Sequence, residues 1–142
     1  MRACHLFAVT CAAVLQTVCG AAVAQAYPSK PVRFVVPYTP GGSTDLLARA
    51  VGTRLGEALG QPVVFDNRPG ANTIVGFELQ ARSSPDGYTV LAGGFNGLVL
   101  NPLLYRRLPY DVDRDFAAVG MIGISPLMVV VHPSLPIRSV RE

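Results

Sequence analysis

Three short apolar runs stand out along the first two thirds of the chain, and each has the pattern of a buried strand. They are Val32–Val36, Val63–Phe65 and Tyr88–Ala92, all rich in β-branched or aromatic side chains. Such residues pack well on a pleated, buried surface, and runs of this length are typical of strands. The turn Pro85–Gly87 precedes the third run, because proline presets φ and glycine tolerates a positive φ.

Apolar residues between these runs recur at helical spacing instead. The first helix is predicted over Ser43–Leu59, with Ser43 or Thr44 as its cap and Gly60 ending it. A second helix is predicted from Thr73 to Arg82. Strands alternating with helices at these lengths predict an α/β fold, with a parallel sheet flanked by helices.

The pattern is weaker beyond the third strand. A short helical turn is predicted near Leu103–Tyr105, and two further strands over Ala118–Ile122 and Leu127–Val131. The last four residues, Ser139–Glu142, form an S-x-x-E capping box that announces a helix with no residues left to build it. We therefore expect a truncated chain.

The N-terminus has the three parts of a cleavable secretory signal. Arg2 precedes an apolar run, Leu6–Leu15, and small residues end at the A-x-A site Ala24–Ala26. The run is too short for a bilayer, which needs about 20 apolar residues, so a retained membrane anchor is the weaker reading. We expect cleavage after Ala26, and a periplasmic protein.

Composition and charge then exclude several classes of protein. All cysteines precede the predicted cleavage site (Cys4, Cys11 and Cys19), so the mature chain has neither disulfides nor cysteine-bound zinc. The net charge is +3, but the basic residues are scattered, with only Arg106 and Arg107 adjacent. Nucleic-acid binding requires a basic stripe or cluster, so it is not expected.

The loop Pro40–Asp45 joins the first predicted strand to the first helix. In open α/β sheets, ligands bind beyond the carboxyl ends of strands, where helix N-termini present free amides. Two glycines let a ligand approach the backbone, and the hydroxyl groups of Ser43 and Thr44 add donors, which suits a carboxylate or other small anion. A tight turn with an ordinary helix cap explains the same residues equally well.

Asp45 leaves three roles open. It can favour the helix dipole, repel an anion, or accept a hydrogen bond from a ligand amine. Two more glycine-containing loops, Arg68–Thr73 and Gly93–Gly97, follow the second and third strands. The carboxyl ends of parallel strands lie at one edge, so the three loops are expected to converge on one cleft.

Catalysis and metal binding have little support. His132 is the only histidine of the mature chain and stands beside Pro133, which favours a structural role. Asp111, Asp113 and Asp115 alternate, but they lack the glycine and distant glutamate of a calcium loop and are interpreted as a solvated acidic loop. Tyr38, Phe95 and Tyr110 fit either a pocket lining or the core.

Seven segments form an ordered series of motifs that spans nearly all of the mature chain. They are Val35–Asp45, Asn67–Ala71, Pro85–Thr89, Asn101–Tyr105, Leu108–Asp111, Asp115–Phe116 and Pro133–Pro136. In sequence and spacing the series resembles the Bug family, the extracytoplasmic solute-binding receptors of tripartite tricarboxylate transporters.

The resemblance implies a periplasmic-binding-protein-like Venus flytrap of two lobes, with the second lobe truncated here. Residues 1–26 are then the signal peptide, 27–122 an incomplete first lobe, and 123–142 the crossover toward the second. It implies a monomer without cofactor, metal or catalysis that binds a small organic carboxylate and delivers it to a membrane permease.

In the family, the loops matching Tyr38–Asp45 and Gly70–Thr73 hold the carboxylate through backbone amides and waters, and the loop matching Gly94–Gly97 borders the cleft. Family members commonly carry two glycines where this chain has Asn72 and Thr73. The expected ligand-binding residues are Tyr38, Thr39, Gly41, Gly42, Ser43, Thr44, Asp45, Gly70, Ala71, Asn72, Thr73, Gly94 and Asn96.

Two alternatives to a carboxylate receptor stay open. A remnant of such a receptor, carrying only half of the cleft, would bind poorly or not at all. A hydrolase or transferase could use the glycine-rich loops as an anion site, although no nucleophile–base pair accompanies them.

Overall fold

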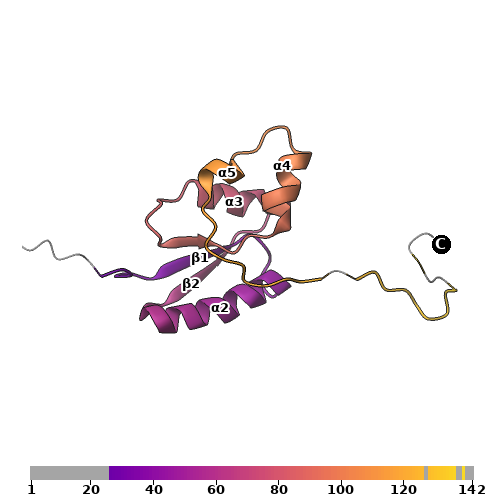
Figure 1. Ribbon diagram of the computed structural model, residues 1–142, viewed down its shortest axis with the longest axis horizontal. Helices are drawn as coiled ribbons and strands as arrows, with labels where there is room; N and C mark the ends of the chain where they lie inside the picture. Colours follow the sequence, from indigo (N-terminus) through magenta and orange to yellow (C-terminus); the bar gives the residue numbers. More distant parts are fainter. Residues whose placement is uncertain (1–25, 127, 137–138, 140–142) are drawn as a thin grey trace, which may run out of the picture.

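A three-stranded parallel sheet forms the centre of the chain (Figure 1). The computed structural model describes residues 26–126, 128–136 and 139. Strand β1 (Val32–Val36) is central, with β2 (Val63–Asn67) on one side and β3 (Thr89–Leu91) on the other. Val32 pairs with Val63, and Arg33 pairs with Thr89. The predicted α/β fold is confirmed.

Helices cover both faces of this sheet (Figure 1). The long helix α2 (Ser43–Leu59) lies below the sheet in the figure, against β1 and β2. Helix α3 (Ile74–Ala81) lies above it, preceded by the 3₁₀ turn η1 (Ala71–Thr73). The two helices occupy opposite faces because β2 and β3 flank β1, and right-handed crossovers in opposite directions require opposite faces.

The main core lies between β1 and α2. Val32, Phe34 and Val36 alternate along β1 and pack in one buried cluster with Ala48 of α2. Alternate residues of a strand point to the same face, which is why these three side chains share a layer. Helix α2 ends before Gly60, as predicted, and Gly60 has the left-handed φ of 67° that is common after the last turn of a helix.

A second apolar layer lies on the α3 side. Phe77 of α3 is fully buried and packs against the rings of Tyr110 and Phe116, with centroid separations of 5.2 and 5.5 Å. The chain reaches this layer through a π-helical turn, η2 (Asn96–Leu100), and two short helices, α4 (Asn101–Leu104) and α5 (Val112–Asp115). The predicted turn near Leu103 is therefore the end of a longer helical stretch.

Three local expectations need correction. Neither Ser43 nor Thr44 caps α2, because the cap residue is Gly42 and no side chain bonds there. Strand β2 runs two residues further than predicted, to Asn67, because Asp66 and Asn67 continue the ladder opposite Val35 and Val36 of β1. The acidic loop is helix α5, since the carboxylate of Asp111 accepts hydrogen bonds from two amides of its first turn.

The two C-terminal strand predictions are wrong for the residues that the structure describes. Residues 118–122 and 128–131 form no strand, and Leu127 lies outside the described residues. The segment runs past α2 and away from the sheet (Figure 1). Its most exposed apolar side chains are 81% to 91% exposed: Val119, Met121, Ile124, Met128, Val129 and Val130. A strand requires a partner ladder, and neither β2 nor β3 supplies one here.

Residues 1–25 of the predicted signal peptide, with its three cysteines, and most of the C-terminal capping box lie outside the described residues. Among the residues that are described, no helix has the length and apolar character needed to span a bilayer.

Candidate functional site

Three loops leave the carboxyl ends of the strands at one edge of the sheet. They follow β1 (residues 37–42), β2 (residues 68–70, leading into η1) and β3 (residues 92–95). The chain leaves β1 toward α2 on one face, and leaves β3 toward η2 and α4 on the other (Figure 1). Such a divergence between neighbouring parallel strands opens the crevice in which α/β proteins bind ligands.

The first loop leaves the N-terminus of α2 open. Gly42 caps the helix in an extended conformation, with φ −74° and ψ 166°, and no side chain accepts from the first-turn amides. Gly41 before it has a φ of 84°, a conformation that disfavours any residue with a Cβ. The backbone at Gly42–Thr44 therefore presents free N–H groups at the positive end of a helix dipole of 17 residues.

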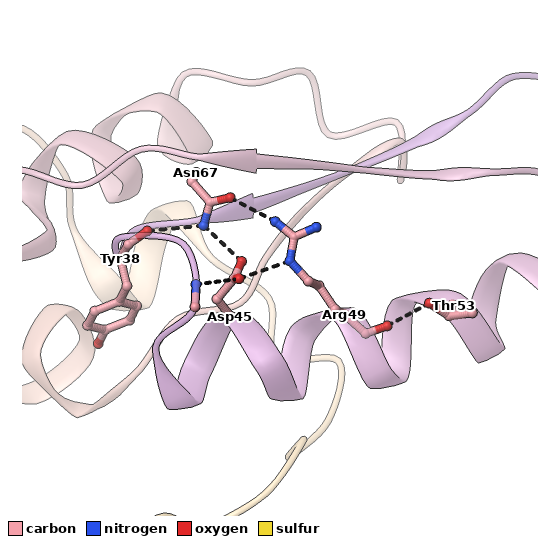
Figure 2. Close-up of polar contacts among 6 residues, drawn as sticks. Tyr38, Asp45, Arg49, Thr53 and Asn67 are labelled. Atoms are coloured by element: carbon pink, nitrogen blue, oxygen red, sulfur yellow. Dashed lines mark hydrogen bonds and ion pairs between the residues drawn. The ribbon is translucent and has the colours of Figure 1, made fainter.

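A buried polar cluster holds this loop in shape (Figure 2). The Asp45 side chain is only 2% exposed. Its Oδ2 accepts from the Gly41 amide and from Arg49 Nε, both at 2.9 Å, while Oδ1 accepts from Asn67 Nδ2 at 2.9 Å. The same Asn67 amide donates to the Tyr38 carbonyl at 3.1 Å. The cluster thus fastens both ends of the loop to the end of β2.

These donors fix the ionisation of Asp45. The hydrogen bond from Arg49, followed by those from the Gly41 amide and Asn67, holds the pKa of the Asp45 carboxyl far below its usual range. Both carboxylate oxygens are occupied within the protein, which leaves little capacity for a ligand amine. The geometry therefore does not favour acceptance from a ligand amine. It favours a structural role, in which Asp45 holds the first loop in shape at the start of α2.

The second loop has an unusual backbone. Ala71, Asn72 and Thr73 have φ values of 45°, 50° and 75°, so three successive residues with side chains lie in the left-handed region. Left-handed residues other than glycine are uncommon, and for a β-branched residue such as threonine the conformation is a real outlier. Ala71 and Asn72 are exposed, whereas Thr73 is buried.

Asparagine side chains join the second loop to the third. Asn96 Nδ2 donates to Asn72 Oδ1 at 3.0 Å. Asn72 Nδ2 donates to Asn101 Oδ1 at 2.7 Å, and Asn101 Nδ2 returns a bond to the Asn72 carbonyl at 2.8 Å. Residues 72 and 96, both predicted ligand contacts, are therefore neighbours in space.

The first and third loops also touch. A Cβ added to Gly94 would lie 2.6 Å from the Tyr38 hydroxyl oxygen, so a larger residue there would displace the Tyr38 side chain from this loop. Partial burial there raises the pKa of the Tyr38 phenol. Phe95 is 65% exposed, and Tyr110 is buried with Phe77. Of the three aromatic residues singled out in the sequence, Tyr38 lies between two loops, Phe95 faces solvent and Tyr110 belongs to the core.

The structure therefore places the predicted site residues in two groups. One is the first loop, the other is the second and third loops joined by Asn72 and Asn96, and the contact between Tyr38 and Gly94 links the two. Exposed positions on the first loop are Thr39, Gly41, Gly42 and Ser43, with Thr44 partly covered. Three residues that hold these loops in place through hydrogen bonds were not predicted as part of the site: Arg49, Asn67 and Asn101. A polar residue at the end of a strand, such as Asn67, is the signal that could have found one of them.

The remaining candidates do not join this site. His132 is exposed, and its Nδ1 bonds with the near neighbour Ser134, pairing with the hydroxyl at 2.7 Å and accepting from the backbone amide at 3.2 Å. Within the part of the chain that the structure describes, no three acidic, histidine or cysteine side chains are grouped to hold a metal ion. Arg114 lowers the pKa of Asp115 to about 2 by a direct hydrogen bond, and the Asp111 amide adds to this.

Comparison with known proteins points in one direction. Residues 47–142 match the family model of the tripartite tricarboxylate transporter family receptor, TctC. Protein BugT of Bordetella pertussis is 41% identical over 117 residues, which is 82% of this chain and 36% of BugT. A UPF0065 protein of Bordetella bronchiseptica is 43% identical over 122 residues, 86% of this chain and 36% of that protein. The chain therefore spans about a third of the length of these relatives.

Solved structures share the fold. A Rhodopseudomonas palustris protein, Rpa4515 with adipate, superposes with a TM-score of 0.59 at 40% identity, over 61% of this chain and 29% of that one. MatC from the same organism, with bound malate, gives 0.61 at 33% identity, over 63% and 31%. A structure described as a periplasmic transporter gives 0.60 at 45% identity, over 61% and 29%.

Proposed function

Because the chain belongs to the tripartite tricarboxylate transporter receptor family, whose members are binding receptors and not enzymes, we propose that it carries one side of a binding site for a small organic carboxylate. Two of the matched structures hold adipate and malate, which are small dicarboxylates. The carboxylate would bind at the three converging loops, without a cofactor and without chemical change.

The open N-terminus of α2 is the observation that supports this proposal most directly. Its first-turn amides have no side-chain cap, and they lie beyond the carboxyl end of β1, at the edge of the sheet where the three loops leave the strands. Free amides at the positive end of a helix dipole complement a carboxylate. Arg49 and Asn67 engage Asp45, so its charge is compensated inside the loop and does not oppose the ligand.

The contacts in this proposal are those expected from the sequence, with Asp45 shifted from direct contact to support of the first loop. Amides of the first loop and of Gly70–Thr73 would hold the carboxylate, and Tyr38, Gly94 and Asn96 would form the far side. Closure of a second lobe would complete the site, as contacts made only in a closed state favour that state.

Delivery of the ligand to a membrane permease in the periplasm is part of the same proposal. The TctC family consists of receptors of tripartite tricarboxylate transporters, and the leader has the pattern of an export signal. The mass of the exported chain tests the leader: a mature N-terminus at Tyr27 supports it, and a retained Met1 contradicts it.

Two variants at the helix cap test the carboxylate site. Titration calorimetry measures binding of a panel that includes malate, adipate, citrate and their neutral amides. Gly42→Asp puts a carboxylate at the N-terminus of α2, where it is compatible with the fold and competes with the ligand. Gly42→Asn has nearly the same shape without the charge. We expect Gly42→Asp to weaken carboxylate binding at least ten-fold, and Gly42→Asn to weaken it much less.

Gln61→Glu is the matched control, because it adds the same charge just beyond the other end of α2. It should leave affinity unchanged. Equal losses in the Asp and Asn variants, or binding of the neutral amides as tight as that of the acids, would contradict an anion site. Absence of binding to every acid would favour the alternative that this stretch of chain does not bind by itself.

A further inference from the structure

We propose that Asn101 is a positioning residue for the ligand: its buried amide holds the left-handed turn Ala71–Thr73 in the shape that the carboxylate requires. The inference rests on the proposed function, in which this turn forms one lip of the site. Asn101 lies in α4, behind the lip, and is not expected to contact the ligand.

The turn is unfavourable by itself. Three successive residues with positive φ, none of them glycine, oppose the normal preference of L-amino acids. Such backbone persists only where surrounding contacts impose it, and it is concentrated at functional sites. Without such contacts, residues 71–73 would relax toward ordinary backbone conformations.

Asn101 supplies the contacts. Its side chain is fully buried, and it both gives and receives a hydrogen bond with Asn72: Nδ2 donates to the Asn72 carbonyl at 2.8 Å, and Oδ1 accepts from Asn72 Nδ2 at 2.7 Å. The Asn101 amide also lies 3.5 Å from Thr73 Oγ1. A buried amide satisfied in this way specifies one backbone arrangement, because any other arrangement leaves its polar atoms without partners.

Asn101 is itself held in place by buried neighbours, which makes its restraint on the turn effective. Asn101 Nδ2 donates to the Tyr110 hydroxyl at 3.3 Å, and that hydroxyl donates to the carbonyl of Gly97 in η2 at 2.7 Å. Tyr110 in turn packs on Phe77 of α3. The restraint on the second loop is therefore anchored in the core and in the helical turn that follows the third loop.

A preformed lip binds more tightly than one that must be ordered by its ligand. In Asn101→Ala, the turn loses both bonds to Asn72 and relaxes, so we expect malate or adipate affinity to fall about ten-fold or more. Thr73→Gly makes the left-handed conformation accessible without help. In the double variant we expect about five-fold of the lost affinity to return, as removal of left-handed strain predicts.

Gln80→Ala is the matched control. Gln80 also donates its side-chain amide to a backbone carbonyl, that of Thr89, but at the far end of α3 from the lip. Its loss should lower stability and leave affinity unchanged. Unchanged affinity in Asn101→Ala overturns the proposal, and so does a loss that Thr73→Gly fails to restore. An asparagine that only stabilises the fold would give a loss of affinity that Thr73→Gly does not restore.

If Asn101→Ala does not fold, Asn72→Ala is the substitute, because it removes the side-chain hydrogen bond between Asn72 and Asn101 by a change at an exposed residue. We expect Thr73→Gly to restore part of the affinity lost in Asn72→Ala as well. A stability cycle separates this inference from the proposed function. Urea unfolding without ligand should show a smaller effect of Asn101→Ala in the Thr73→Gly background. Additive effects overturn the positioning role even where no carboxylate binds, whereas coupling without carboxylate binding supports the restraint on the turn and contradicts the proposed function alone.

Discussion

Three donors surround the carboxylate of Asp45: a backbone amide of the first loop, a guanidinium one turn along α2, and an amide from the end of β2. The Arg49 guanidinium that supplies one of them also lies 4.8 Å from the centroid of the Phe65 ring, which holds it over β2. A single ionised side chain therefore ties the loop, the helix and the sheet together.

This arrangement makes stability depend on pH with a definite sign. The hydrogen bond from Arg49, with those from Gly41 and Asn67, lowers the pKa of Asp45 in the folded chain below the value of about 3.9 that an unfolded aspartate has. Its contribution is complete above that pH and is lost as pH falls toward the folded pKa. Urea unfolding between pH 6 and pH 2 should therefore show a weaker pH dependence for Asp45→Asn than for the wild type.

Asp113→Asn is the charge-matched control, since Asp113 is exposed on α5. It should reproduce the pH dependence of the wild type. Parallel curves for the wild type and Asp45→Asn would show that the cluster does not stabilise the carboxylate.

Two adjacent glycines provide a second test at the residue scale. Gly41 has a φ of 84°, whereas Gly42 has a φ of −74° and ordinary space for a Cβ, with the nearest atom 3.6 Å away. Gly41→Ala should lower the free energy of unfolding by about 1–2 kcal/mol, and Gly42→Ala by well under about 1 kcal/mol. Chemical denaturation of the two variants measures the difference, and equal losses would refute the assigned backbone.

Among the elements, α3 depends on one ring. Phe77 is fully buried against Gly97 and packs with Tyr110 and Phe116, so Phe77→Ala leaves a cavity in the second apolar layer, on the α3 side of the sheet. We expect a loss of about 3–5 kcal/mol in the free energy of unfolding. Phe95→Ala is the control, because the same truncation at a ring that is 65% exposed removes little buried area. A loss below about 1 kcal/mol at Phe77 would contradict the described packing.

The elements also show what the sequence can predict. Strand β1 and the extent of α2 follow from local patterns, because alternation and a glycine after the last turn are local signals. Residues 118–122 have the same β-branched and apolar character as β1 but form no strand. Pairing depends on a partner strand elsewhere in the chain, which local composition cannot reveal.

The candidate site also has a part that could be predicted from the sequence and a part that could not. Convergence of the three loops follows from the parallel sheet, so it could be predicted, although the residue-by-residue ligand contacts remain a prediction. Support for these loops was harder to predict, because Asn67 and Asn101 act through partners about thirty residues away in sequence. The position of Asn67 at the end of a strand is a local signal, whereas nothing in the immediate sequence of Asn101 distinguishes it from an ordinary polar residue.

At the scale of the whole molecule, residues 117–131 stand apart from the packed layers. The described side chains of this segment are exposed, and a close approach to the folded part occurs where Gly123 lies near Leu47 of α2. Thermolysin, which cleaves before apolar residues, should therefore cut this segment first. We expect a shortened product ending between residues 117 and 130 whose melting temperature equals that of the intact chain.

Mass spectrometry of the digest identifies the cut, and the thermal melt compares the two chains. Initial cleavage within α2 or β1, or a clear fall in melting temperature after trimming, would show that the segment is part of the cooperative fold.

The strand order has a consequence for the timing of folding. Strand β1 is the only described strand with a partner on both edges, and its second partner, β3, ends at Leu91. The central strand therefore stays incomplete until β3 has left the ribosome, and pairings between distant segments form slowly. At a synthesis rate of about 5–20 residues per second, we expect the first residues of the chain to wait for the third strand before the sheet can close. If the predicted leader directs export, a chain that has not yet folded is the form that a membrane translocation channel can thread.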